Sequence, residues 1–411
     1  MKKENTKLST ASYFLIAAII VLVILAVQFF LLPLLGFGTD SEMGIVGTGR
    51  VIHYDFDAGA AFHSNDSRFF YYASRDGIRR IASNSNLDWH HAFLLNSPSV
   101  AARGDYIAVG EERGGRVIYV FDTNGMIFNI TMNDPILAFF INETGFLSVI
   151  VEYGGGYGIY VFNRHLHNPE NPLFRWTEFN ELLAPSHVEV SPDGRYIAIA
   201  VMDLSISVRT SVQFRYLSQW DAWGTDHGLF ATQDFQGQLV TALRFMSNNR
   251  LVVSTTSRVT CFQLGPGHTV SRELWTIHLD NQKTHIEFFD DTHFAIAMGD
   301  RLSLVTNEGY PLGTVRIYNM NRTQLGTFEL GRRVTHLRMG HNSVLVGGGR
   351  SFHAIDFRGN SIWEHTTLFD TRDVLFLENT GTILIAGSIQ SEIFERRRLR
   401  EYERATFSEE E

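Results

Sequence analysis

One short phrase of sequence recurs along most of the chain and constrains its fold more than any other feature. The clearest copy is SVAARGDYIAVGEERGGRVIYVFDTNG, at residues 99–125. Runs of β-branched and aromatic residues alternate with Gly-Asp, Gly-Gly and Asn-Gly pairs, which favour tight hairpin turns. Beyond residue 45 almost no stretch has apolar residues at the spacing of an amphipathic helix. The phrase therefore predicts a repeated hairpin unit of an all-β fold.

The number of copies predicts the architecture. Units start near residues 60, 99, 135, 187, 241, 285, 336 and 373, which makes eight. Residues 48–400 give about 44 residues per unit, close to a four-stranded propeller blade. We therefore expect an eight-bladed β-propeller. A seven-bladed ring, at about 50 residues per blade, is the alternative if two weak copies merge.

The last unit is short, and a strand is left over before the first one. The leftover strand is RVIHYDF, at residues 50–56, and the short unit starts near residue 373. A strand from the start of the chain can complete the last blade and so leave no free sheet edge. We expect the ring to close in this way.

A long apolar run precedes the repeats. YFLIAAIIVLVILAVQFFLLPLL, at residues 13–35, has Gln28 as its only clearly polar side chain. About 20 apolar helical residues cross a bilayer core. Three lysines precede the run, whereas acidic residues and no bases follow it closely. The run is too long for a typical signal peptide and lacks a small-x-small cleavage site. It therefore predicts a single-pass membrane helix with a cytoplasmic N-terminus.

These patterns divide the chain into five parts. Residues 1–12 are the expected cytoplasmic stub, 13–35 the transmembrane helix, 36–47 a linker, 48–400 the extracytoplasmic propeller and 401–411 a charged tail. The expected location is the cytoplasmic membrane, crossed once.

Two copies of the phrase resemble known propeller repeats. SPDGRYIAIA, at residues 191–200, is similar to the strand pair of WD40-like and YVTN-type propellers. Residues 343–364 are similar to the blade phrase of quinoprotein (PQQ)-like repeats. The combination of an N-terminal anchor and a propeller also looks like uncharacterised bacterial envelope proteins. The resemblance implies a β-propeller that serves as a binding platform and only sometimes as an enzyme.

Charge and cysteine content exclude two classes of protein. The net charge is −9, and the basic stub leaves the rest of the chain more acidic still, so a nucleic-acid partner is not expected. The lone Cys261 excludes a disulfide framework. Only four of the basic residues are lysines, and three of these lie in the stub; Lys283 is the one lysine of the propeller region.

No motif predicts catalysis, a cofactor or a metal. A quinone-dependent dehydrogenase would need an adjacent-cysteine pair, which is absent. The pairs His90-His91 and His165-x-His167 supply two ligands at most, and zinc needs more. The glycine runs at 154–156 and 347–349 lie between strands, so we expect hairpin turns or bulges there. No catalytic, cofactor-binding or metal-binding residue is therefore predicted.

An insertion between two strands carries the candidate partner-binding residues. The loop at 217–228 lengthens its unit and contains Trp220, Trp223 and His227. Aromatic residues on a long loop suit contact with a protein partner. The alternative is that both tryptophan rings cover the edge of their own blade.

The expected function is a non-catalytic scaffold or protein-interaction module in a cell-envelope complex, with other envelope or membrane proteins as partners. The alternatives are a small-molecule or glycan sensor, and a quinoprotein-like enzyme with its site at the central channel. Converging Asp, Glu, Arg and His at the channel would favour these alternatives. A channel plugged by apolar side chains would favour the scaffold.

Overall fold

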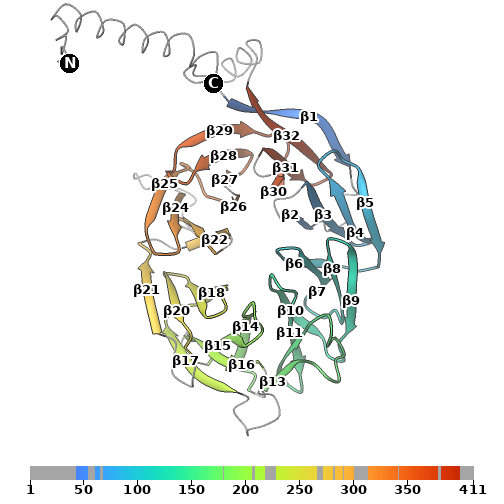
Figure 1. Cartoon of the computed structure of the whole chain (residues 1–411), viewed down its shortest axis with the longest axis vertical. Coiled ribbons are helices and arrows are strands. Elements are labelled where there is room, and N and C mark those ends of the chain that lie inside the picture. The colour runs from blue at the N-terminus through green and yellow to red at the C-terminus, as the bar shows by residue number, and fades with distance from the viewer. Residues whose placement is uncertain are drawn as a thin grey trace, which may run out of the picture. The chain divides into compact units, whose positions relative to one another are not determined.

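The described strands form eight four-stranded sheets arranged as the blades of a ring (Figure 1). The structure, a computed structural model, describes residues 43–53, 61–64, 68–178, 180–205, 209–217, 228–265, 272–280, 283–289, 291–299, 313–340, 342–377 and 381–398. Residues 45–396 form one compact unit. Every element within the described ranges is a strand. The predicted eight-bladed β-propeller is therefore confirmed.

Each blade is one antiparallel meander whose first strand lies nearest the centre of the ring (Figure 1). Blades 1 to 4 are β2 (Ala61–Ser64), β3 (Phe69–Ser74), β4 (Gly77–Ala82) and β5 (Leu87–Ala92); β6 (Pro98–Arg103), β7 (Tyr106–Glu111), β8 (Val117–Asp122) and β9 (Gly125–Thr131); β10 (Ile136–Ile141), β11 (Leu147–Tyr153), β12 (Gly156–Phe162) and β13 (Phe174–Glu178); and β14 (Leu183–Val190), β15 (Tyr196–Asp203), β16 (Arg209–Tyr216) and β17 (Leu229–Gln236).

Blades 5 to 8 follow the same plan, except that blade 8 takes its outermost strand from the start of the chain. They are β18 (Val240–Ser247), β19 (Arg250–Thr255), β20 (Arg258–Gln263) and β21 (Arg272–His278); β22 (Lys283–Phe289), β23 (His293–Met298), β24 (Thr314–Asn319) and β25 (Gln324–Glu329); β26 (His336–Met339), β27 (Ser343–Gly348), β28 (Ser351–Asp356) and β29 (Ser361–Thr366); and β30 (Thr371–Leu377), β31 (Thr382–Gly387), β32 (Gln390–Arg398) and β1 (Met43–His53).

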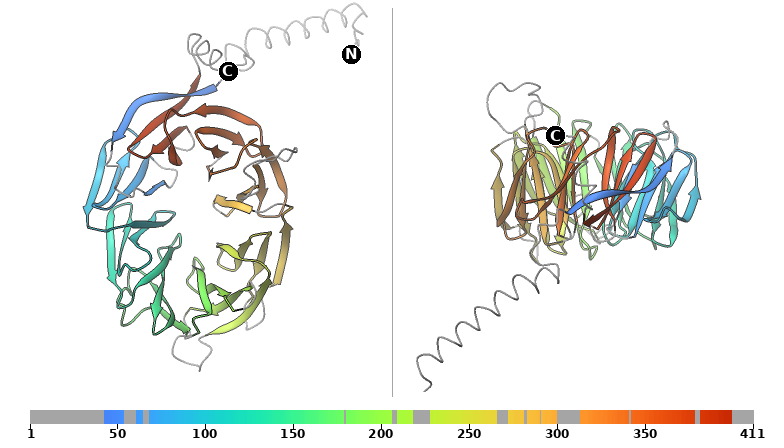
Figure 2. Two further views of the ribbon diagram at one scale, coloured as in Figure 1. Left: turned by 180° about the vertical axis from the view of Figure 1, so that it is seen from behind. Right: turned by 90° about the horizontal axis from the view of Figure 1, so that it is seen from above.

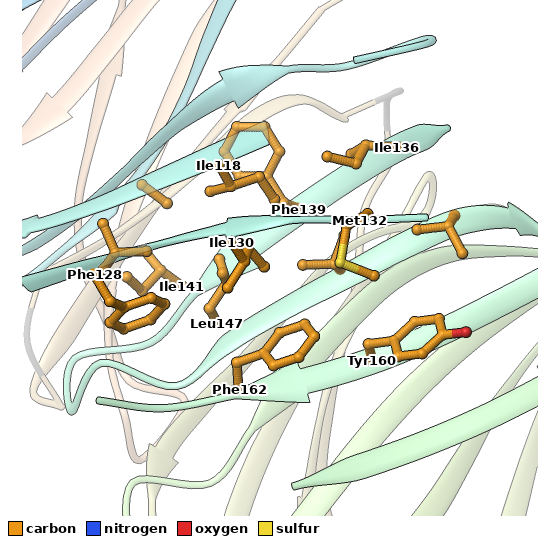
Figure 3. Packing of buried hydrophobic residues seen from close by; sticks show 14 residues of the cluster. Ile118, Phe128, Ile130, Met132, Ile136, Phe139, Ile141, Leu147, Tyr160 and Phe162 are labelled. Carbon is orange, nitrogen blue, oxygen red and sulfur yellow. The ribbon is translucent and has the colours of Figure 1, made fainter. Parts of the chain in front are cut away.

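Apolar layers between neighbouring blades form the core. Strand residues alternate between the two faces of a sheet, so each blade contributes side chains to the layer before it and to the layer after it. Between blades 2 and 3, for example, Phe128 and Ile130 of β9 pack with Phe139 of β10 and Phe162 of β12 (Figure 3). Similar layers follow all the way round the ring.

The ring closes by the pairing of β1 with β32 (Figure 2). The Thr48 hydroxyl donates a hydrogen bond to the carbonyl oxygen of Ile393 at 2.9 Å, and the Ile45 side chain is 2% exposed within the layer between blades 7 and 8. The predicted closure is confirmed, although the strand begins at Met43, before the expected start of the propeller at residue 48. Glycines at 44, 47 and 49 lower strand propensity there, but the edge of β32 offers backbone partners that the sequence pattern does not reveal.

The seven-bladed alternative is wrong. No two copies of the phrase merge, because each of the eight begins its own four-stranded sheet. Both glycine runs behave largely as expected: Gly154 and Gly155 form the turn between β11 and β12, whereas Gly347 and Gly348 end β27.

The predicted membrane helix at 13–35 lies outside the described residues. Within the described ranges, no helix combines the length and apolar character needed to span a bilayer. The charged tail at 401–411 also lies outside them.

Candidate ligand-binding site in the central channel

A polar cavity of about 550 Å³ lies among the innermost strands. Its walls come from blades 1, 2, 5, 6, 7 and 8, so residues far apart in the chain meet there. The charged and titratable residues that line it are His63, Arg103, Arg244, Glu287, Arg338, Arg372 and Asp373. The volume falls within the range of ligand-binding cavities in proteins.

Four charged residues occupy one repeated position on four consecutive blades. Each lies on a first strand, opposite the third residue of the second strand, and the signs alternate. The pairs are Glu189 with Ala198, Arg244 with Val252, Glu287 with Ala295, and Arg338 with Leu345. We call Glu189, Arg244, Glu287 and Arg338 the charged arc. On blades 8, 1 and 2 the same position holds Leu375, His63 and Ala101.

The alternation of strand side chains turns the arc away from the packed layers that hold its neighbours, and Arg244, Glu287 and Arg338 of the arc line the cavity. Val188 and Val190, on either side of Glu189, pack into the layer between blades 3 and 4. Leu243 and Phe245, on either side of Arg244, pack into the layer between blades 4 and 5. Because neighbouring strand residues face opposite ways, the apolar pair anchors each strand while the charged residue points to the other face.

Arg338 lies between two carboxylates. Its Nη2 is 3.0 Å from both carboxylate oxygens of Asp373 on blade 8, and its Nη1 is 3.9 Å from Oε2 of Glu287 on blade 6. Burial alone would lower the pKa of Arg338, but the attraction of Asp373 and Glu287 outweighs it and raises this pKa. The arginine therefore joins blades 6, 7 and 8 electrostatically.

Arg103 pairs with Glu189 across blade 3. The Arg103 guanidinium donates a hydrogen bond to Oε1 of Glu189, from blade 2 to blade 4. Glu189 is 5% exposed, and burial raises the pKa of its carboxyl group although Arg103 and Arg244 oppose the rise. Burial likewise raises the pKa of Glu287, against the attraction of Arg338. Both carboxyl groups therefore depend on nearby arginines to remain charged.

Arg244 differs from the other two arginines described so far. No carboxylate oxygen of a described residue lies within 4 Å of its guanidinium, and its enclosed Nε has no hydrogen-bond partner. Burial, followed by repulsion from Arg103, lowers its pKa; Glu189, Glu143 and Asp291 attract it from farther away. Arg244 is thus a guanidinium with unused hydrogen-bonding capacity beside the cavity.

His63 contributes an uncharged ring at neutral pH. Burial, together with the nearby charge of Arg338, lowers the pKa of His63 to about 4, while a hydrogen bond with the Gly104 backbone opposes the shift. Together these groups can bind and orient a charged ligand by hydrogen bonds and Coulomb attraction. Among the described residues, no three His, Cys, Asp or Glu side chains converge as metal ligands.

The histidine pairs and Cys261 that were considered from the sequence do not line this cavity. Trp220, Trp223 and His227 belong to the connection between β16 and β17 and lie outside the described residues, so their role stays a prediction. His167 stacks on Phe128, with ring centroids 5.1 Å apart, and His91 packs edge-on against Phe121. Cys261 is buried in β20, and burial raises the pKa of its thiol to about 11.

The charged arc was not predicted from the sequence, although the alternation of charges between copies is visible there. Aligned on their first strands, four copies read HVEV, ALRF, HIEF and HLRM, from residues 187, 242, 285 and 336. The third letter alternates between Glu and Arg, whereas the second and fourth stay apolar. An alignment of the copies, compared position by position, would have revealed the alternating charges.

Residues 58–393 match the model of a protein family described as "Family of unknown function (DUF5711)". The chain belongs to this family. The match covers all eight blades except β1 and the end of β32, so the DUF5711 family corresponds to the propeller. No curated protein sequence is significantly similar to this DUF5711 chain.

Solved propeller structures resemble the DUF5711 chain at low sequence identity. BamB from Moraxella catarrhalis has a TM-score of 0.51 and 12% identity, over 87% of this chain and 99% of that one. Sqt1 from Saccharomyces cerevisiae has a TM-score of 0.55 and 11% identity, over 84% and 97%. These likenesses establish that the DUF5711 chain has the β-propeller fold of the WD40 and BamB-like proteins.

Proposed function

We propose that the protein is a non-catalytic recognition module of the bacterial cell envelope, held at the inner membrane by residues 13–35. The apolar run and the lysines before it support the anchor. In this proposal the propeller lies outside the cytoplasm and binds another envelope or membrane protein. Anchoring would confine the ring to the membrane surface and so raise the effective concentration of its partner there.

One observation carries the binding role: the charged cavity in the channel. Its charges meet from five blades, and most of them are held by each other, as in the contacts of Arg338 with Asp373 and of Arg103 with Glu189. Groups held in this way need no reorganisation when a ligand binds, which lowers the entropic cost of binding. A rigid ring with a prepared polar cavity suits recognition of a charged feature on a partner.

A small-molecule sensor is the second candidate, and the same cavity favours it. Converging acidic, basic and histidine side chains at the channel were expected to favour a sensor or an enzyme, and the cavity has all three. Its volume of about 550 Å³ would hold a small ligand. The two candidates differ in what occupies the cavity, a free molecule or a group on a protein.

Photo-crosslinking in cells separates the two candidates. A photoreactive residue at Met339, which lines the cavity, should capture a specific envelope protein. The matched control is the same residue at Met126, which is 44% exposed on the outer strand β9. Capture at Met339 and not at Met126 supports protein recognition at the channel. Equal capture at both positions, or none at Met339, contradicts it.

Cell fractionation tests the anchor. The full chain should sediment with membranes and resist extraction at alkaline pH, because a spanning helix holds it in the bilayer. Removal of residues 1–35 should release the propeller into the soluble fraction. A full chain that washes off membranes at alkaline pH would contradict the anchor and leave the channel proposal intact.

A further inference from the structure

We propose that Arg244 binds a carboxylate group inside the channel cavity. The inference rests on the proposed function for one point only, namely that the carboxylate belongs to a bound protein, as an acidic side chain or a C-terminus. A free organic acid carries the same chemistry, and the experiment below distinguishes these two sources.

The first step is the charge balance of the cavity. Four arginines line it: Arg103, Arg244, Arg338 and Arg372. Two carboxylates, Glu287 and Asp373, line it as well. Glu189, which does not line the cavity, forms an ion pair with Arg103. Arginines therefore outnumber carboxylates among the lining side chains, and this excess of positive charge favours an anionic ligand such as a carboxylate.

The second step is the position of the excess charge. Arg338 already contacts both oxygens of Asp373 and lies near Glu287, and Arg103 already bonds to Glu189. Arg244 has no carboxylate oxygen of a described residue within 4 Å, and its enclosed Nε lacks a hydrogen-bond partner. A buried donor without a partner is costly, so a ligand that accepts its hydrogen bond gains affinity there.

The third step is the geometry of the donor. A guanidinium presents two parallel N–H groups along one edge, and a carboxylate accepts both in a planar fork. On Arg244 the edge that contains Nε is unused. Burial and then repulsion from Arg103 disfavour the positive charge of Arg244. The negative charge of a carboxylate bound beside it would offset both effects.

Glu143 is the internal competitor for Arg244. Its Oε2 is enclosed without a hydrogen-bond partner, and its charge attracts Arg244 from beyond hydrogen-bonding distance. Its charge would repel a carboxylate that approaches Arg244. Removal of the Glu143 charge should therefore strengthen carboxylate binding, which is the opposite of the effect expected at Arg244.

Ligand-observed NMR on the full-length chain in detergent tests the inference. The probes are sodium propionate, the peptide acetyl-Gly-Glu-Gly-amide, its Gln counterpart and inorganic phosphate. Wild type should bind propionate and the Glu peptide but not the Gln peptide. Arg244→Gln should weaken binding of both carboxylates at least about tenfold, and Arg244→Lys by less, because lysine keeps the charge but loses the fork. Glu143→Gln should strengthen binding.

Arg250→Gln is the matched control, because Arg250 lies on the same blade but is exposed at the start of β19. If Arg250→Gln weakens binding as much as Arg244→Gln, the attraction is nonspecific and the inference is wrong. Binding of phosphate alone would also overturn it. Far-UV circular dichroism of each variant checks the fold, and the Lys variant keeps the test valid if Arg244→Gln does not fold.

The same variants distinguish the source of the carboxylate. Loss of capture at Met339 in Arg244→Gln, with tighter binding of the Glu peptide than of propionate, supports a protein carboxylate. If propionate binding depends on Arg244 but no protein is captured at Met339, the carboxylate site stands and protein recognition at the channel is contradicted. Capture at Met339 that is unchanged in Arg244→Gln overturns the inference and leaves the proposed function standing.

Discussion

The layers between blades and the ring of residues at the channel are built by the same first strands, yet they repeat to different degrees. In the layers, every blade supplies apolar side chains at alternate positions, as Val188 and Val190 do on blade 4 and Leu243 and Phe245 do on blade 5. The position between such apolar residues varies instead, from Leu375 and Ala101, which pack in layers, to His63 and the four residues of the charged arc.

Because the chain holds eight copies of one unit, equivalent positions can be compared between its blades. Features that all copies share are those that the propeller architecture needs, because each blade must bury both sheet faces against its neighbours. Features that differ between copies at one position are not required for closure of the ring. The charged arc is such a feature, and this separates it from the packing that surrounds it. The predictions below test that separation.

The largest effect is expected in the layers, and it should be similar in different blades. Phe245, between blades 4 and 5, and Phe352, between blades 7 and 8, are both fully buried. Replacement of either by Ala leaves a cavity and should lower the free energy of unfolding by about 3–5 kcal/mol. Urea denaturation measures both losses. If the free energy of unfolding falls less than half as much in one variant as in the other, the two layers do not contribute equally to stability.

The next effect is acid sensitivity that originates at the channel. Burial is the main cause that lowers the pKa of His63 and of His187 to about 4, from a usual value of 6.5. Between pH 6.5 and 4 the unfolded chain therefore binds more protons than the folded chain. Stability should fall as the pH falls through this window, by up to about 3 kcal/mol for each histidine.

The double variant with His63→Asn and His187→Asn should lose less stability than wild type between pH 7 and pH 4.5, as measured by urea midpoints at both pH values. The exposed His165 is the control, and His165→Asn should leave acid sensitivity as it is in wild type. Equal acid sensitivity in the double variant and wild type would show that the origin lies elsewhere.

A smaller effect is expected from the arginine that joins three blades. Arg338→Gln removes two hydrogen bonds to Asp373 and leaves the Asp373 carboxylate without the positive charge of Arg338. Because the Arg338 side chain is 38% exposed, solvent screens part of the loss. We expect a loss of about 1–2 kcal/mol in the free energy of unfolding. Arg209→Gln, which breaks the more exposed pair with Asp234, should cost less than about 1 kcal/mol.

The smallest effect on stability belongs to the residue assigned to binding. Arg244 makes no ion pair within 4 Å with a described residue, and its burial disfavours its charge. Arg244→Gln should therefore change the free energy of unfolding by less than about 1 kcal/mol while it weakens carboxylate binding at least about tenfold. If Arg244→Gln lowered the free energy of unfolding as much as Arg338→Gln, Arg244 would be a structural residue. The distinction between the packed layers and the charged arc would then fail at this position.

Much of the fold was predictable from the sequence because its determinants are local. Alternating apolar residues and turn dipeptides recur eight times, and each recurrence predicts a hairpin by itself. The strand at the start of the chain was placed several residues late, because Gly44, Gly47 and Gly49 weaken the local pattern that β32 restores by pairing. The aromatic loop with Trp220 and Trp223 stays a prediction.

The candidate site was less predictable because it depends on which strands meet. Within each copy, one charged residue between two apolar ones looks like an ordinary solvated strand position. The contact of Arg103 with Glu189 joins residues 86 positions apart, and no spacing rule relates them. The fold class and blade count therefore followed from periodicity and turn chemistry, which act over a few residues. Only the closed ring decided which charges share a cavity, because ring closure sets the distances between strands that the chain itself keeps far apart.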